Sequence, residues 1–242
     1  MKKSKELKRI AREILNNRYG VPMGAFFVTS VITLAIEIPF SLSMGDHPGI
    51  QQYIISYLAD FLISLLAAIL AAGQLRIHLD MARGKEVKVS QVFSYFKNRP
   101  ERYIGSAFLL SILSLLCLLP LFAGFLFFYV TSLSDAGAVA VVVTALVSIV
   151  LMLYVSICYA LVTYLLVDNQ NMKVLDALRE SRRLLKGNIW RYLCLSLSFL
   201  GWSILIILTL GIASLWIQPY ITQTFTQFYL TLSTQQGGNS YE

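Results

Sequence analysis

Charged side chains are scarce in this chain of 242 residues: Asp, Glu, Lys and Arg make up 14%, whereas hydrophobic residues make up 57%. Soluble chains carry roughly a quarter charged residues, because charges cover the surface that faces water. A soluble fold with this composition would leave a large apolar surface in water, so an ordinary soluble domain is excluded. Bilayer hydrocarbon solvates apolar side chains, and the composition therefore predicts an integral membrane protein.

Cysteine and histidine are also rare, with three Cys and two His. Cys117, Cys158 and Cys194 stand in apolar runs without the spacing of a metal or redox motif, and we expect three small buried side chains. His47 and His78 are predicted on opposite sides of the membrane, where they share no metal, and His78 is expected to be a polar interfacial residue. Phosphate-binding glycine loops and His-Glu-x-x-His and Cys-x-x-Cys motifs are missing. We therefore expect no enzyme activity, no catalytic residue, no metal and no cofactor.

Long apolar runs organise the sequence. A membrane-spanning helix needs about 20 mostly apolar residues, and the first four runs of this length cover residues 19–40, 53–79, 103–129 and 138–167. The last run, residues 192–232, is long enough for two crossings, with a tight turn at residues 208–211 where Gly211 supplies backbone freedom. The expected fold is an all-α membrane protein, a single membrane domain of about six transmembrane helices arranged as three hairpins.

All 20 Lys and Arg fall into three segments, residues 2–18, 76–102 and 173–191. The connectors between the spans hold Asp46 and Asp135 but no basic residue. Because basic loops stay on the cytoplasmic side, both basic loops and both termini are predicted to be cytoplasmic, in a bacterial plasma membrane. The net charge of +7 then reflects anionic lipid as the partner rather than nucleic acid. A cleaved signal peptide ending near Ser41 and Ser43 is an alternative for the N-terminus.

Each basic segment has the periodicity of a one-sided helix. Its apolar stripe is Leu7, Ile10, Ala11, Ile14 and Leu15 in the first segment, and Val89, Val92, Phe93 and Phe96 in the second, where Ser90 is a possible cap. In the third segment the stripe is Val174, Ala177, Leu178, Ser181, Leu184 and Leu185. A polar joint follows each helix, at residues 16–20, 98–100 and 186–188. This pattern predicts three repeats, residues 4–80, 88–168 and 172–233, each an amphipathic cytoplasmic helix and a transmembrane hairpin, followed by a short polar tail at 234–242.

Two placements of the amphipathic helices are open. They could lie in the headgroup layer, where each basic residue near anionic lipid contributes about 1 kcal/mol. Alternatively, their apolar faces pack on one another or cap the bundle. The expected lipid-facing basic residues are Lys5, Lys8, Arg9, Arg12, Arg179, Arg182, Arg183 and Lys186.

Four acidic residues are predicted at or within the spans. Glu37 and Asp60 fall in the outer half of adjacent spans, with no basic residue on that side. Because an unpaired carboxylate is costly in lipid, each must be hydrated at the interface, protonated or bound to a cation. They are therefore either interfacial acids or a proton or cation site. Asp80 and Asp168 end the second and fourth spans and are expected to pair with nearby arginines.

Small residues indicate close helix contacts. They form the Gly20-x-x-x-Gly24 spacing and a face made of Ala67, Ala68, Ala71, Ala72 and Gly73.

The C-terminal third also resembles a known family. Residues 176–188 are similar to its signature, as are residues 198–202, 208–212, 219–220 and 228–229, and the basic helix that runs into Tyr19 and Gly20 fits as well. These stretches resemble the bacterial integral membrane proteins grouped as domain of unknown function 975. The resemblance implies a multi-pass bacterial membrane protein and supplies no catalytic residue.

The expected function is that of a non-enzymatic membrane protein that binds anionic lipid at its cytoplasmic face and acts in envelope maintenance or assembly. The alternative is a small transporter or exporter of peptides or lipids. Its polar path would run near Glu37, Asp60, Tyr154, Tyr159 and Tyr164.

Overall fold

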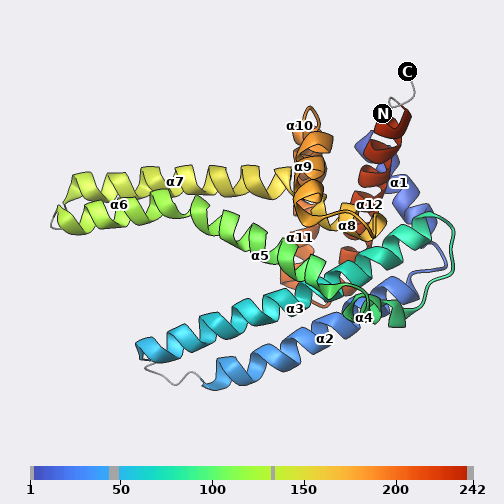
Figure 1. Cartoon of the computed structure of the whole chain (residues 1–242), viewed down its shortest axis with the longest axis horizontal. Helices are drawn as coiled ribbons and strands as arrows, with labels where there is room; N and C mark the ends of the chain where they lie inside the picture. The colour runs from blue at the N-terminus through green and yellow to red at the C-terminus, as the bar shows by residue number, and fades with distance from the viewer. Residues whose placement is uncertain (1–2, 44–48, 132–133, 239–242) are drawn as a thin grey trace.

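The computed structural model describes residues 3–43, 49–131 and 134–238, and these residues form helices joined by short turns, with no strand among them (Figure 1). The side chains of residues 41, 43 and 236–238 fall outside the description. The predicted all-α class is confirmed over this part of the chain. The connector with Asp46 and His47 lies outside the described residues, and so do the predictions made for those two side chains.

The first predicted repeat corresponds to α1 (Ser4–Leu15), α2 (Gly20–Ser43) and α3 (Ile50–Ala82). In α1, Leu7, Ala11 and Leu15 are buried, while Lys5 and Arg9 are exposed. α2 and α3 lie side by side as an antiparallel pair (Figure 1).

The second predicted repeat is more broken than the sequence indicates. It comprises η1 (Val89–Phe93), α4 (Ser94–Lys97), α5 (Pro100–Cys117), α6 (Leu119–Val130), α7 (Asp135–Cys158) and α8 (Val162–Asp168). The third predicted span is divided between α5 and α6 because Pro120, in the first turn of α6, lacks the N–H that would continue the helix ladder. α6 and α7 pack on each other and extend away from the other helices, at the left of Figure 1.

The third predicted repeat comprises α9 (Val174–Leu185), α10 (Ile189–Leu197), α11 (Leu200–Leu208) and α12 (Ser214–Gly238). The turn predicted between the last two crossings joins α11 to α12. Leu210 and Gly211 have φ angles of 50° and 90° there, in the left-handed region that glycine adopts most easily. The turn is therefore confirmed, and the glycine stands where the backbone requires it.

Five helical stretches are long and apolar enough to cross a membrane: Gly20–Phe40, Ile50–Ala82, Pro100–Val130, Asp135–Asp168 and Ile189–Leu208. The sixth predicted span, α12, is not among them, so five of the expected crossings are supported among the described residues and the sixth stays a prediction. α12 is helical, but Gln223, Thr224 and Thr226 lie in its middle and are almost completely buried. Its polar side chains are enclosed by protein, and the helix need not be apolar throughout.

The core of the molecule lies where α12 packs against α1 and α3 and where α3 packs against α8 (Figure 1). Leu15, Ile77, Leu166 and Tyr229 come from these four helices and are all buried. Residues far apart in the sequence therefore share one core.

The second basic segment differs from the predicted amphipathic helix. It forms the 3-10 helix η1 and the short α4, and the N-cap is Lys88 rather than Ser90. Val92 is buried as predicted, but Phe93 and Phe96 are exposed. The backbone of this segment lies directly against α3, because a Cβ at Gly73 would overlap the carbonyl of Val92.

The small residues have a different neighbour from the one expected. Gly73 and Gly24 both lie against η1 rather than another spanning helix, whereas Gly20 has no heavy atom within 4 Å of its would-be Cβ. The prediction of a close contact is confirmed at Gly73. At Gly20 it is wrong, because no neighbour lies close to this residue.

All three polar joints have the same backbone geometry. Asn17, Arg99 and Gly187, with φ angles of 61°, 53° and 85°, each stand two residues after the last residue of α1, α4 and α9. Helices commonly end with a left-handed residue at this position. The joints therefore stop three basic helices in the same way.

Candidate functional site

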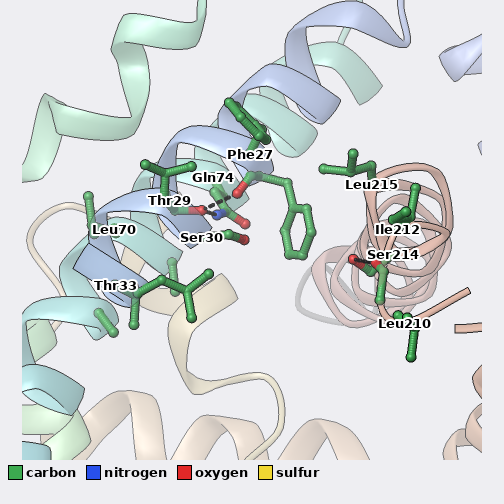
Figure 2. A pocket seen from close by; sticks show the side chains of 16 residues that line it. Phe27, Thr29, Ser30, Thr33, Leu70, Gln74, Leu210, Ile212, Ser214 and Leu215 are labelled. Carbon is green, nitrogen blue, oxygen red and sulfur yellow. Dashed lines mark hydrogen bonds between the residues drawn. The ribbon is translucent and has the colours of Figure 1, made fainter. Parts of the chain in front are cut away.

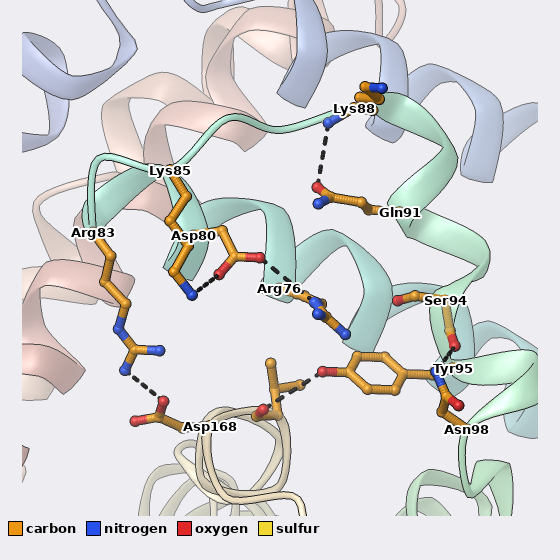
Figure 3. Close-up of polar contacts among 11 residues, drawn as sticks. Arg76, Asp80, Arg83, Lys85, Lys88, Gln91, Ser94, Tyr95, Asn98 and Asp168 are labelled. Carbon is orange, nitrogen blue, oxygen red and sulfur yellow. Dashed lines mark hydrogen bonds and ion pairs between the residues drawn. The ribbon is translucent and has the colours of Figure 1, made fainter.

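A charged network joins the ends of α3 and α8 (Figure 3). Asp80 lies 3.5 Å from Arg76 and 3.2 Å from Lys85, and Asp168 lies 2.5 Å from Arg83. The predicted pairing of both aspartates with nearby basic residues is confirmed. Since Asp80 is almost fully buried, its two partners compensate a carboxylate that would otherwise be costly.

Tyr229 connects α12 to this network. Its hydroxyl donates a hydrogen bond of 2.9 Å to Asp168, and its ring stacks on Tyr164 with 5.3 Å between centroids. Burial raises the pKa of Tyr229, and the Asp168 carboxylate raises it further. The hydroxyl therefore stays protonated at neutral pH and keeps its role as a donor.

His78 is buried inside the protein, and its position at the membrane interface stays a prediction. Its Nδ1 lies 2.8 Å from Oε1 of Gln223 in α12. The Nε2 atoms of Gln223 and Gln227 are buried and have no hydrogen-bond partner among the described residues. The sequence pattern missed this cluster because its members come from α3 and α12, 145 positions apart.

A groove of about 660 Å³ opens between α2, α3 and the α11–α12 turn (Figure 2). Most of its lining is apolar, including Phe27, Leu70 and Leu215. Its polar side chains are Thr29, Ser30, Thr33, Gln74 and Ser214, and Gln74 donates a hydrogen bond to Thr29. Small-molecule sites have about this volume and a few placed polar groups, so the groove can accept an apolar chain.

Glu37 and Asp60 are exposed on the α2–α3 pair. Neither side chain lines the groove. Of the tyrosines expected along a transport path, Tyr154 is exposed and Tyr164 is buried against Tyr229. The proton or cation site remains a prediction.

The basic residues expected to face lipid are largely outward on α1 and α9. Lys5, Arg9, Arg12, Arg179, Arg182, Arg183 and Lys186 are exposed. Lys8 is half-buried, because its amino group lies 4.1 Å from the centre of the Phe199 ring and donates to the Ser198 carbonyl. Burial, together with the nearby charge of Arg12, lowers the pKa of Lys8.

The apolar faces of the same helices pack inside the protein. Leu7 and Leu15 of α1 and Ala177 and Leu185 of α9 are at most 2% exposed. These apolar faces therefore pack against the bundle, which is the second of the two placements considered for the amphipathic helices. The basic faces lie on the surface, where Arg9, Arg179 and Arg183 form ion pairs with acidic residues of their own helices.

Ser181 of α9 bonds to the backbone at the break between α7 and α8, which the hydropathy pattern does not show. Its hydroxyl donates to the Cys158 carbonyl at 2.9 Å and accepts from the Leu161 N–H at 3.3 Å. α9 thus satisfies backbone groups that are left open where α7 gives way to α8. A serine within an apolar stripe is a signal that could have indicated this role.

The cysteines follow the prediction in part. Cys117 and Cys158 are buried, whereas Cys194 on α10 is exposed. Since α10 belongs to an apolar stretch able to span a membrane, its surface can be covered by lipid instead of protein.

Over the described residues these features define an all-helical protein with five stretches long and apolar enough to cross a bilayer, as in a membrane protein. The family model described as protein of unknown function (DUF975) matches residues 1–236, and the chain belongs to that family. The resemblance seen in the sequence is thereby confirmed. Comparison with the curated proteins gave no match, and comparison with the solved structures gave none either.

Proposed function

We propose that the protein is a non-enzymatic, multi-pass protein of the bacterial plasma membrane that binds anionic lipid and serves envelope maintenance or assembly. The N-terminus and the basic loops are cytoplasmic in this proposal, because all 20 Lys and Arg lie in the three basic segments. The C-terminus returns to the same side if α12 is the sixth crossing.

The observation that carries the proposal is the division of faces on α1 and α9. Their apolar faces are buried in the protein, which fixes both helices and leaves Arg9, Arg12, Arg182 and Arg183 on the surface. Each basic residue near an anionic membrane contributes about 1 kcal/mol. Because the helices are already packed, binding does not have to order them.

The groove adds an apolar surface that complements the basic faces of α1 and α9. It lies between α2 and α3, two of the stretches able to span a membrane, and its apolar lining suits an acyl chain. No comparable observation favours the transporter alternative, since Glu37 and Asp60 are exposed and do not line the groove.

The test measures lipid-dependent stability of the full-length protein in a neutral detergent. Phosphatidylglycerol should raise its melting temperature more than phosphatidylcholine does. A variant with Arg179, Arg182, Arg183 and Lys186 all replaced by Gln should lose most of this difference. The control variant Lys88→Gln removes one exposed charge outside both helices and should respond as the wild type does. An unchanged response of the fourfold variant would disprove lipid binding by α9.

A further inference from the structure

A second, smaller cavity lies between the α4–α5 joint and the turn that follows α8. It has a volume of about 310 Å³, and its lining is mostly polar. Lys97, Arg99 and Arg102 bring three positive charges to it, and Asn98, Gln170 and Asn171 add neutral polar groups. Figure 3 shows Asn98 next to Tyr95, whose ring also lines the cavity.

The charges of this cavity are not neutralised by an acid. Arg99 donates to the Gln170 carbonyl at 3.2 Å and to Oδ1 of Asn171 at 3.5 Å. Arg102 donates from Nη2 to the carbonyls of Asn169 and Met172, at 2.8 Å and 2.7 Å, and from Nε to the Met172 carbonyl at 3.2 Å, which leaves its Nη1 for a ligand. All of these acceptors are neutral, so both guanidinium groups keep their full charge.

The nearest acids are engaged elsewhere or lie outside the cavity. Asp168 is paired with Arg83 and bonded by Tyr229. Glu101, in the first turn of α5, does not line the cavity and forms no ion pair within the described part of the chain. A basic cavity without an acid attracts an anion.

The backbone of Arg99 is the second observation. Arg99 has φ 53° and ψ 54°, the left-handed conformation, and it is the N-cap of α5. The equivalent joints have Asn17 and Gly187, which are residue types that adopt this conformation readily. Arginine does not, and strained residues of this kind gather at binding sites, where the side chain is needed.

The start of α5 favours the same ligand. α5 is 18 residues long and begins at Pro100, directly after Arg99. Pro100 has no N–H to offer a ligand, but the helix dipole favours negative charge at this end. The cations and the helix start therefore attract the same kind of ligand.

We propose that the cavity formed by Lys97, Arg99 and Arg102 binds a phosphate group. Arginine pairs are suited to phosphate because their planar donors match its oxygens. The phosphate can belong to a lipid headgroup or to a free phosphate compound. The site uses no residue of α1 or α9, so it does not depend on the function proposed for those helices.

The experiment follows the melting temperature of the full-length protein in neutral detergent at fixed ionic strength. One arm adds inorganic phosphate, with chloride as the matched anion, and the other adds phosphatidylglycerol, with phosphatidylcholine as the matched lipid. A specific rise with inorganic phosphate indicates a free phosphate ligand. A rise with phosphatidylglycerol alone indicates a headgroup in this cavity if Arg99→Asn and Lys97→Gln reduce it, because lipid bound at α9 would not respond to these variants. Failure of both arms would overturn the proposal.

The variant Arg99→Asn separates binding from structure. Asn accepts the left-handed conformation, so the melting temperature without ligand should be equal or higher, while the apparent affinity for the stabilising anion should fall about tenfold or more. A lower melting temperature with unchanged anion response would show that Arg99 only holds the 169–172 turn, and would overturn the proposal.

Lys97→Gln provides an independent variant, because Lys97 is exposed and makes no hydrogen bond or ion pair with the described residues. It should fold normally and bind the anion more weakly. Lys88→Gln, an exposed charge outside the cavity, should leave anion binding unchanged. Equal loss in Lys88→Gln and Lys97→Gln would show general charge attraction and contradict a built site.

Discussion

The α6–α7 hairpin and the core around α12 are built in opposite ways. In the hairpin, large apolar side chains point outward, and Phe122, Leu126 and Val150 are each 65–66% exposed. Its helices meet through small residues, with Gly124 against Thr144. Around α12 the interior is mixed, since Leu166 and Gln223 are both fully enclosed.

This difference fits different surroundings for the two regions, with lipid outside the hairpin and protein around α12. Lipid can cover the outside of the hairpin, so apolar burial contributes little to the contact between α6 and α7, and close packing of small residues holds it. The core around α12 is surrounded by protein, and there hydrogen bonds between distant side chains add to apolar packing. Substitutions should therefore act differently in the two regions.

The largest effect is expected for Gly73→Ala, near the core. The added Cβ would overlap the backbone of Val92, and backbone cannot rotate away as a side chain can. We expect a loss of about 3 kcal/mol in unfolding free energy, the upper end for overpacking. Unfolding in mixed detergent micelles measures it. Gly20→Ala, where the new Cβ meets nothing within 4 Å, should be close to neutral, and equal effects of the two would refute the backbone contact.

Ser181→Ala tests the cap between α7 and α8. The variant leaves the Cys158 carbonyl and the Leu161 N–H without the partner they have in the structure, in a fully buried place. The expected loss is about 1–3 kcal/mol. Ser196→Ala is the control, because that hydroxyl bonds only to the Tyr192 carbonyl of its own helix. A loss no greater than in the control would show that Ser181 has no capping role.

In the hairpin, Gly124→Ala should destabilise less than Gly73→Ala. The added Cβ meets the side chain of Thr144, not backbone, so we expect a loss of about 1–2 kcal/mol. Shortening the neighbour in the double variant with Thr144→Ala should restore most of the stability. The same unfolding assay measures both variants, and absence of rescue would place the strain elsewhere.

The smallest effect is expected for Tyr229→Phe, which removes a hydrogen bond but leaves Asp168 paired with Arg83. The loss should be about 1 kcal/mol near neutral pH. Because the folded protein raises the pKa of Tyr229, the unfolded chain releases this proton first, and stability falls as the pH rises above about 10. Melting curves between pH 8 and 11 should show a smaller alkaline loss in Tyr229→Phe, and parallel curves would exclude this linkage.

The sequence pattern predicted the helices of this fold well where all residues of a stretch face the same solvent. The five apolar stretches lie close to their predicted positions, and Gly211 marks a turn that no charge indicates. Asp80 and Asp168 have the predicted kind of partner because arginines stand close by in the sequence or at the equivalent helix end. The candidate acids Glu37 and Asp60 were located by residue type alone, and their role stays a prediction.

The sequence by itself determined the all-helical class, the apolar stretches and the three basic segments, because each depends on neighbouring residues and their solvent. Only the tertiary structure decided that α12 lies in the core, that His78 bonds to Gln223, and that Arg99 and Arg102 share a cavity with Asn171. Hydropathy assigns a polar residue to water, whereas a folded chain can bury it beside a partner from a distant segment. The identity of that partner depends on how the helices pack.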